Sequence, residues 1–139
     1  MLFLFSHAFA APAFDLLKLR DPVPCAALGE ATPVLRDELL LLTAPDILPS
    51  SVPMRAADCL AERFAEDPAV QAAFTAWTLD PARPGQVLLL LGRADTLPEP
   101  MALALVRGSL ASPSARVSEK ARSVAELSAA ASIRALVTP

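Results

Sequence analysis

The sequence predicts an all-α fold, and three observations carry that prediction. Hydrophobic residues make up 54% of the chain, and Ala and Leu supply most of them, with no Tyr and few Val or Ile. Ala and Leu lose little on entering a helix, whereas strands favour β-branched and aromatic residues. The 14 prolines cut the chain into short segments, and hairpin dipeptides such as Asn-Gly are absent. We therefore expect short helices bounded by prolines and essentially no sheet; the stacking of these helices as antiparallel hairpins is what the proline spacing and a family resemblance, given below, imply.

Residues 1–11 resemble the end of a secretory signal peptide, because an apolar start runs into the small-x-small triplet Ala8-Phe9-Ala10. The positively charged start of a complete signal is missing. Either the true start lies upstream, or this segment is a hydrophobic first helix packed on the core. We expect a periplasmic or secreted protein, with a cytoplasmic one as the alternative. Export would permit a disulfide between Cys25 and Cys59, whereas a reducing compartment would leave two buried thiols.

Residues 12–50 are expected to form an atypical helical cap. Prolines bound its segments because a helix interior excludes them. The expected helices cover residues 13–20, a turn near 25–28, and 33–42. The apolar run 39–42, like 87–91 further on, is far shorter than the roughly 20 residues of a membrane-spanning helix. Both runs are therefore predicted to be core, and no membrane span is expected.

Residues 51–139 carry the clearer helix signals. The segment 53–65 places its apolar residues on one face, and its charged residues, Arg55 among them, fall largely outside that face. The segment 68–79 begins with Asp67 and Pro68, an N-cap followed by proline at the first helical position. Its residues Val70, Phe74 and Trp77 line one face, which predicts a core stripe. A binding hot spot at Trp77 is the alternative.

Three further segments complete this region. The segment 84–93 contains the run 87–91, which is apolar all round and is typical of a buried helix, with a buried strand as the second interpretation. Arg83 and Arg93 bracket it, and we interpret them as solvated charges at the helix ends. A helix is expected over 98–110. A last helical region is expected within 114–137, for which Ser112-Pro113 offers a weak start.

The spacing of the prolines indicates repetition. Alternate helix starts lie about 30 residues apart along the chain. This is the length of one helical hairpin. The positions that set this spacing are Pro53, Pro68, Pro84, Pro98 and Pro113. Similar helix starts recur at Val52 and Val70, and more faintly at Val117.

These starts resemble those of HEAT-like repeats, in particular the short bacterial kind found in phycobilisome-lyase-type proteins. In that family an Asp-Pro-x-Val-Arg-x-x-Ala-type stretch opens the second helix of each hairpin. The residues that match it are Asp67, Pro68, Val70 and Ala73, with Gln71 in place of the arginine. The resemblance covers about residues 50–137. It implies a short right-handed solenoid whose inner helix faces bind a partner.

No catalytic, cofactor-binding or metal-binding group is predicted. The one histidine, His7, lies within 1–11, so cleavage there would leave serine and cysteine nucleophiles without their usual base. One His and two Cys make a poor zinc ligand set. Carboxylates such as those of Glu62 and Glu66, which lie one helical turn apart, are typical of an exposed helix face. The cluster Arg116, Lys120 and Arg122 is interrupted by Glu119, unlike the dense basic stripe of nucleic-acid binders.

The resulting hypothesis is a non-catalytic scaffold for protein–protein interaction. The partner is an unidentified protein rather than a nucleic acid, and the oligomeric state stays open. The candidate interaction surface comprises Trp77, Arg83 and Arg93. The alternatives are an accessory subunit or lyase-like chaperone for an enzyme or a tetrapyrrole, and a fragment of a longer repeat protein.

Overall fold

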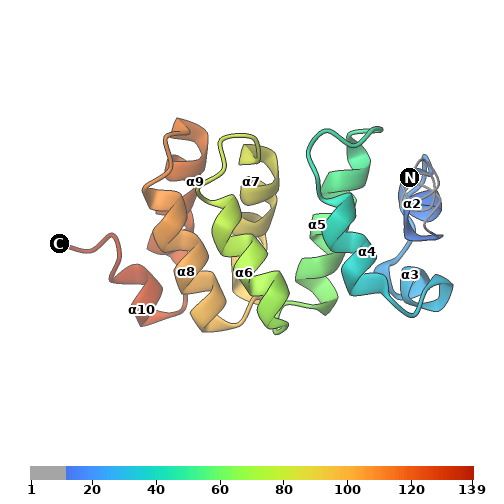
Figure 1. The fold of residues 1–139 in the computed structure, drawn as a ribbon. Coiled ribbons are helices and arrows are strands. Elements are labelled where there is room, and N and C mark those ends of the chain that lie inside the picture. The colour runs from blue at the N-terminus through green and yellow to red at the C-terminus, as the bar shows by residue number, and fades with distance from the viewer. Residues whose placement is uncertain (1–11) are drawn as a thin grey trace. The chain divides into compact units, whose positions relative to one another are not determined.

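The computed structural model describes residues 12–139, and within that range every regular element is a helix (Figure 1). The all-α prediction is therefore confirmed, and the apolar run 87–91 is helical rather than a strand. The predicted signal segment and His7 lie outside the described residues. The helices are α2 (Pro12–Leu17), α3 (Cys25–Ala31), α4 (Leu35–Leu42), α5 (Ser51–Arg63), α6 (Pro68–Trp77), α7 (Pro84–Gly92), η1 (Ala94–Thr96, a 3-10 turn), α8 (Glu99–Leu110), α9 (Ala115–Leu127) and α10 (Ala131–Arg134).

The start of α6 shows how the local sequence sets a helix boundary. The side chain of Asp67 accepts hydrogen bonds from the backbone N–H groups of Ala69, at 2.9 Å, and Val70, at 3.3 Å. Pro68 takes the first helical position, where its missing N–H removes no intrahelical bond. The N-cap predicted from Asp67 is confirmed.

The last helical region lies within the expected residues 114–137 and comprises two helices, α9 and α10. The cap of α9 is Ser114, whose hydroxyl accepts from the N–H of Val117, so the helix begins just after the weak start signal at Ser112-Pro113. The chain then becomes extended at Ser128 and Ala130. The Ser128 hydroxyl accepts from the N–H of Ala130 at 3.1 Å. A serine bonding to its own local backbone in this way competes with the helix and ends it.

The described chain divides into two compact units, with unit 1 ending at Arg63 and unit 2 beginning at Phe64. Helix α5 belongs to unit 1, where it packs on α2, α3 and α4. The core of unit 1 includes the fully buried side chains of Leu28, Leu39 and Leu60. The apolar face predicted for residues 53–65 supplies part of this core.

Unit 2 contains two helical pairs, followed by the short helix α10, which contacts α8 and α9. Within the pairs α6 contacts α7 and α8 contacts α9; between them α8 contacts α6 and α9 contacts α7 (Figure 1). Fully buried side chains from all four helices fill the centre, among them Phe74, Leu90, Leu105 and Val117. Within the run 87–91, the side chains of Val87, Leu90 and Leu91 are buried in this core.

Helices α6 and α8 approach each other closely at Gly108. A Cβ atom added to Gly108 would lie 2.5 Å from the hydroxyl oxygen of Thr78 and 3.0 Å from its Cβ. Thr78 itself is buried, and its hydroxyl donates to the carbonyl of Thr75 at 2.7 Å. Only glycine leaves room for this contact, because real side chains do not pack at such distances.

Replacing Gly108 by Ala should therefore lower the free energy of unfolding by up to about 2 kcal/mol. Overpacking against Thr78 costs about 1–3 kcal/mol, which outweighs the gain of up to about 1 kcal/mol from the higher helix propensity of alanine. Urea denaturation of the full chain measures the change. Gly92→Ala is the matched control, since a Cβ at Gly92 would meet nothing within 4 Å. Equal behaviour of the two variants would contradict the close approach.

Candidate interaction site

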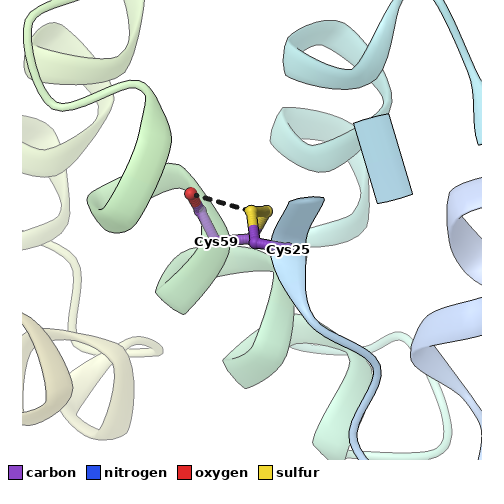
Figure 2. Close-up of a disulfide and its surroundings, with 2 residues drawn as sticks. All are labelled: Cys25 and Cys59. Atoms are coloured by element: carbon purple, nitrogen blue, oxygen red, sulfur yellow. Dashed lines mark hydrogen bonds between the residues drawn. A yellow bond between two sulfur atoms is a disulfide. The ribbon is translucent and has the colours of Figure 1, made fainter. Parts of the chain in front are cut away.

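The two cysteines of unit 1 lie at disulfide distance (Figure 2). Cys25 is the first residue of α3 and Cys59 lies within α5, and their Cα atoms are 5.4 Å apart. Disulfides usually span about 4.4–6.8 Å between Cα atoms, so this separation fits the disulfide that export would permit. Both residues are buried, at 8% and 4% exposure. A bond here ties the short helix α3 to the longest helix of unit 1.

Arg55 has a role that its place in the sequence did not indicate. Its guanidinium donates hydrogen bonds to the carbonyl oxygens of Leu17, at 2.9 Å, Arg20, at 3.2 Å, and Leu19. These carbonyls lie at and just beyond the end of α2, where the last carbonyls of a helix lack partners within it. Arg55 thus fixes the end of α2 to α5. Its place outside the apolar face of α5 gave no signal of this contact.

Trp77 lies in the core of unit 2, with 5% of its surface exposed. The stripe predicted for 68–79 is confirmed, since Val70 and Phe74 are also buried. The rings of Phe74 and Trp77 have centroids 5.1 Å apart, within the range of favourable aromatic pairs. Trp77 therefore stabilises the fold, and any role in binding is limited to the small part of the ring that reaches the surface.

Arg83 covers this tryptophan. The central carbon of its guanidinium lies 4.9 Å from the centroid of the Trp77 ring, a cation–π distance. The same group donates to a carboxylate oxygen of Asp80, at 3.2 Å, and to the amide oxygen of Gln86, at 2.9 Å. Asp80 in turn accepts from the N–H of Ala82 at 2.9 Å. Arg83 is thus fixed in the turn between α6 and α7 and is not the solvated helix-end charge that we expected.

Arg93 does not join this group. It is the C-cap of α7, whereas Arg83 is the N-cap of the same helix, and a helix of this length separates its two ends by roughly 13 Å. The structure therefore brings Trp77 and Arg83 together and places Arg93 at the other end of α7. The interaction surface predicted from all three residues stays a prediction.

A hollow of about 240 Å³ opens beside Trp77, and we call it the corner pocket. The turn between α6 and α7 and the turn between α8 and α9 enclose it. Its buried lining residues are Trp77, Thr78, Val87 and Val117, and its exposed lining residues are Leu79, Pro81, Pro84 and Pro113. Asp80, Ser112 and Ser114 complete it. The pocket is therefore apolar at its base and carries three prolines at its mouth.

Unit 2 has a second hollow of about 190 Å³, which we call the Lys120 pocket. The end of α7, the turn η1 and the second half of α9 line it. Asp95 and Lys120 give it charges of both signs, and Leu127, which is 86% exposed, forms part of its edge. It lacks the aromatic wall and the prolines of the corner pocket.

Among residues 12–139, no three His, Cys, Asp or Glu side chains gather to hold a metal ion. In the same range, no helix combines the length and apolar character needed to cross a membrane.

Comparisons with models of protein families, with curated proteins and with solved structures found no match to this chain. The resemblance to HEAT-like repeats stays a prediction. In unit 2, the corner pocket offers an apolar surface between fixed walls.

Proposed function

We propose that this protein is a protein-interaction module whose corner pocket receives a bulky apolar side chain of a partner. The observation that supports this proposal is the pocket itself, which has Trp77 at its base, prolines around its mouth, and Leu79 beside it. Leu79 is 78% exposed, although a leucine is usually buried. An exposed leucine next to an apolar hollow supplies surface that a docked side chain would remove from water.

The volume of the pocket supports a side chain over a small molecule. Pockets for small ligands and cofactors usually measure about 300–1,000 Å³, and the corner pocket measures about 240 Å³. A tetrapyrrole, the ligand of the lyase-like alternative, is larger than an ordinary small ligand. A single leucine, methionine or phenylalanine side chain suits this volume better.

The walls of the pocket are held in place before any partner arrives. Arg83 lies over Trp77 and is held by Asp80 and Gln86, and each proline has a restricted backbone. Binding to walls that are already ordered loses less conformational entropy than binding to a mobile loop. This supports a docking role for the turn between α6 and α7.

The wider setting is proposed to be a short HEAT-like solenoid. In unit 2 each helix of one pair contacts the corresponding helix of the next pair, which is the packing that stacked hairpins require. Docking sites in such repeats draw residues from neighbouring hairpins, and the corner pocket takes residues from both pairs. The cysteine pair at disulfide distance in turn supports a periplasmic or secreted location, where such bonds persist.

Selection of a random peptide library on the full chain tests the proposal. Peptides that bind at the corner pocket should bind Leu79→Ser about tenfold or more weakly, because burying a leucine contributes about 1.5–3 kcal/mol and 1.4 kcal/mol is a factor of ten in Kd. Leu127→Ser is the matched control, an exposed leucine at the Lys120 pocket. Failure to select any peptide, or peptides that are indifferent to Leu79→Ser, would refute the proposed function.

A further inference from the structure

Within residues 12–63, the three helices that precede α5 are too short to be stable by themselves. Helices α2, α3 and α4 contain 6, 7 and 8 residues, whereas isolated helices shorter than about 12–15 residues are marginal in water. Neither Pro24 before α3 nor Val34 before α4 forms a side-chain cap. These helices therefore depend on contacts with other segments.

Side chains from α4 and α5 supply part of that contact. Arg55 in α5 bonds to carbonyl oxygens at the end of α2. At the start of α2, the carboxylate of Glu38 in α4 accepts a hydrogen bond from the backbone N–H of Ala13 at 3.2 Å. The same carboxylate accepts from the hydroxyl of Thr32, the C-cap residue of α3, at 2.8 Å. These bonds fix both ends of α2 and the end of α3.

The start of α3 is held by the cysteine pair, and unit 1 is small enough for that link to decide whether it folds. Unit 1 ends at Arg63, and below about 70–80 residues one apolar core usually needs additional support such as a disulfide. Cys25 and Cys59 are 34 positions apart. Closing a loop of that size favours the folded state by roughly 100- to 1,000-fold in the chain-entropy account.

Unit 2 is supported differently. Its helices α6, α7, α8 and α9 contain 9 to 13 residues. The side chains of Asp67 and Ser114 cap α6 and α9, and the core contains the aromatic pair Phe74 and Trp77. Both cysteines of the chain lie in unit 1. A thiol reductant therefore acts on unit 1 and leaves the core of unit 2 chemically unchanged.

We propose that unit 1 is a redox-dependent fold, which is folded while Cys25 and Cys59 are joined and unfolds when a thiol of the glutathione class reduces the bond. Unit 2 stays folded in both states. In a compartment that keeps thiols reduced, the corner pocket is therefore present without a folded unit 1, and in an oxidising compartment both units are folded. This inference concerns unit 1 and is independent of the proposed function.

The reduction consumes two molecules of the thiol. One thiolate attacks a cysteine sulfur and forms a mixed disulfide with it, and the other cysteine leaves as a thiolate that takes up a proton. A second thiolate attacks the reductant sulfur of the mixed disulfide and releases the remaining cysteine. The two reductant molecules leave joined as their own disulfide.

The start of α3 gives the reductant its route to the bond. Both cysteines are buried, but Cys25 is the first residue of α3 and the preceding Pro24 is exposed. Helix ends fray, so opening the first turn of α3 exposes the Sγ atom of Cys25 while α5 stays intact.

Hydrogen exchange of the full chain in glutathione buffers of increasing reduced fraction tests the inference, with free thiols counted in parallel by alkylation. Amides of α2 and α4, which contain no cysteine, should lose protection by about 100-fold or more as the two thiols appear. Amides of α6, α7, α8 and α9 should change by less than about twofold, because unit 2 opens separately.

Two arginine variants show whether reduction is coupled to the folding of unit 1. Arg55→Gln loses the bonds to the end of α2, so its unit 1 should unfold at a ratio of reduced to oxidised glutathione about fivefold or more below that of the wild type. Arg122→Gln is the matched control, because Arg122 is an exposed arginine of α9, and its ratio should stay within about twofold.

Three results would overturn the inference. The first is protection of α2 and α4 that persists after both thiols are free. The second is loss of protection in unit 2 at the same step as in unit 1. The third is an Arg55→Gln chain that responds to glutathione as the wild type does.

Discussion

Removing the link between Cys25 and Cys59 should lower the free energy of unfolding by about 3–4 kcal/mol. In the chain-entropy account, a bond that closes a loop of this size restricts the unfolded chain by that amount. A typical domain has only about 5–15 kcal/mol of stability, so much of the stability of unit 1 depends on the bond. Hydrogen exchange followed by mass spectrometry, with and without a reductant, should show faster exchange in α3 and α5 after reduction.

A double variant, Cys25→Ala with Cys59→Ala, is the control for that measurement. It removes the sulfur atoms as well as the bond, so it should be at least as unstable as the reduced wild type and should not respond to the reductant. Two free thiols in the protein purified under oxidising conditions, or exchange in α3 and α5 that reduction leaves unchanged, would contradict a disulfide and remove the support it gives to export.

Replacing Trp77 by Ala should cost about 3–5 kcal/mol, the range expected for deleting a large buried aromatic side chain. The variant loses the ring contact with Phe74 and the cation–π contact with Arg83, and it leaves a cavity in the centre of unit 2. Loss of helical circular dichroism in urea measures the change, because the variant has no tryptophan fluorescence. The urea concentration at the midpoint of unfolding should be much lower for Trp77→Ala than for the wild type.

Leu79→Ala is the control for this prediction. Leu79 is two residues away and 78% exposed, and surface substitutions usually change stability by less than about 0.5 kcal/mol. If the two variants unfold at the same urea concentration, Trp77 does not stabilise the core of unit 2 and does not form a fixed base for the corner pocket.

The features that were predictable from the sequence are those that depend on local chemistry. Pro68 and Asp67 set the start of α6 through contacts within one turn of helix, and the spacing of Phe74 and Trp77 reports the buried face of that helix directly. The pairing of Cys25 with Cys59 was predictable for a different reason, since the chain has no other cysteine with which either could pair.

The features that escaped prediction depend on contacts between distant segments. Arg55 reaches carbonyls in and after α2, far back along the chain, and nothing near residue 55 indicates them. The corner pocket joins two turns, 78–81 and 112–114, which only the packing of α6 on α8 and of α7 on α9 brings together. One local set of contacts also escaped prediction, namely those of Arg83 with Asp80 and Gln86. These residues are spaced three apart, and that spacing would have indicated the pairing.

The fluorescence of Trp77 offers the most direct test of the proposed docking site. Trp77 is the one tryptophan of the chain and there is no tyrosine, so the intrinsic emission reports on the wall of the corner pocket. Titration with a selected peptide should produce a saturable change in emission in the wild type and in Leu127→Ser, and a much weaker response in Leu79→Ser. A peptide that binds tightly by calorimetry while the emission of Trp77 stays unchanged would contradict docking in the corner pocket.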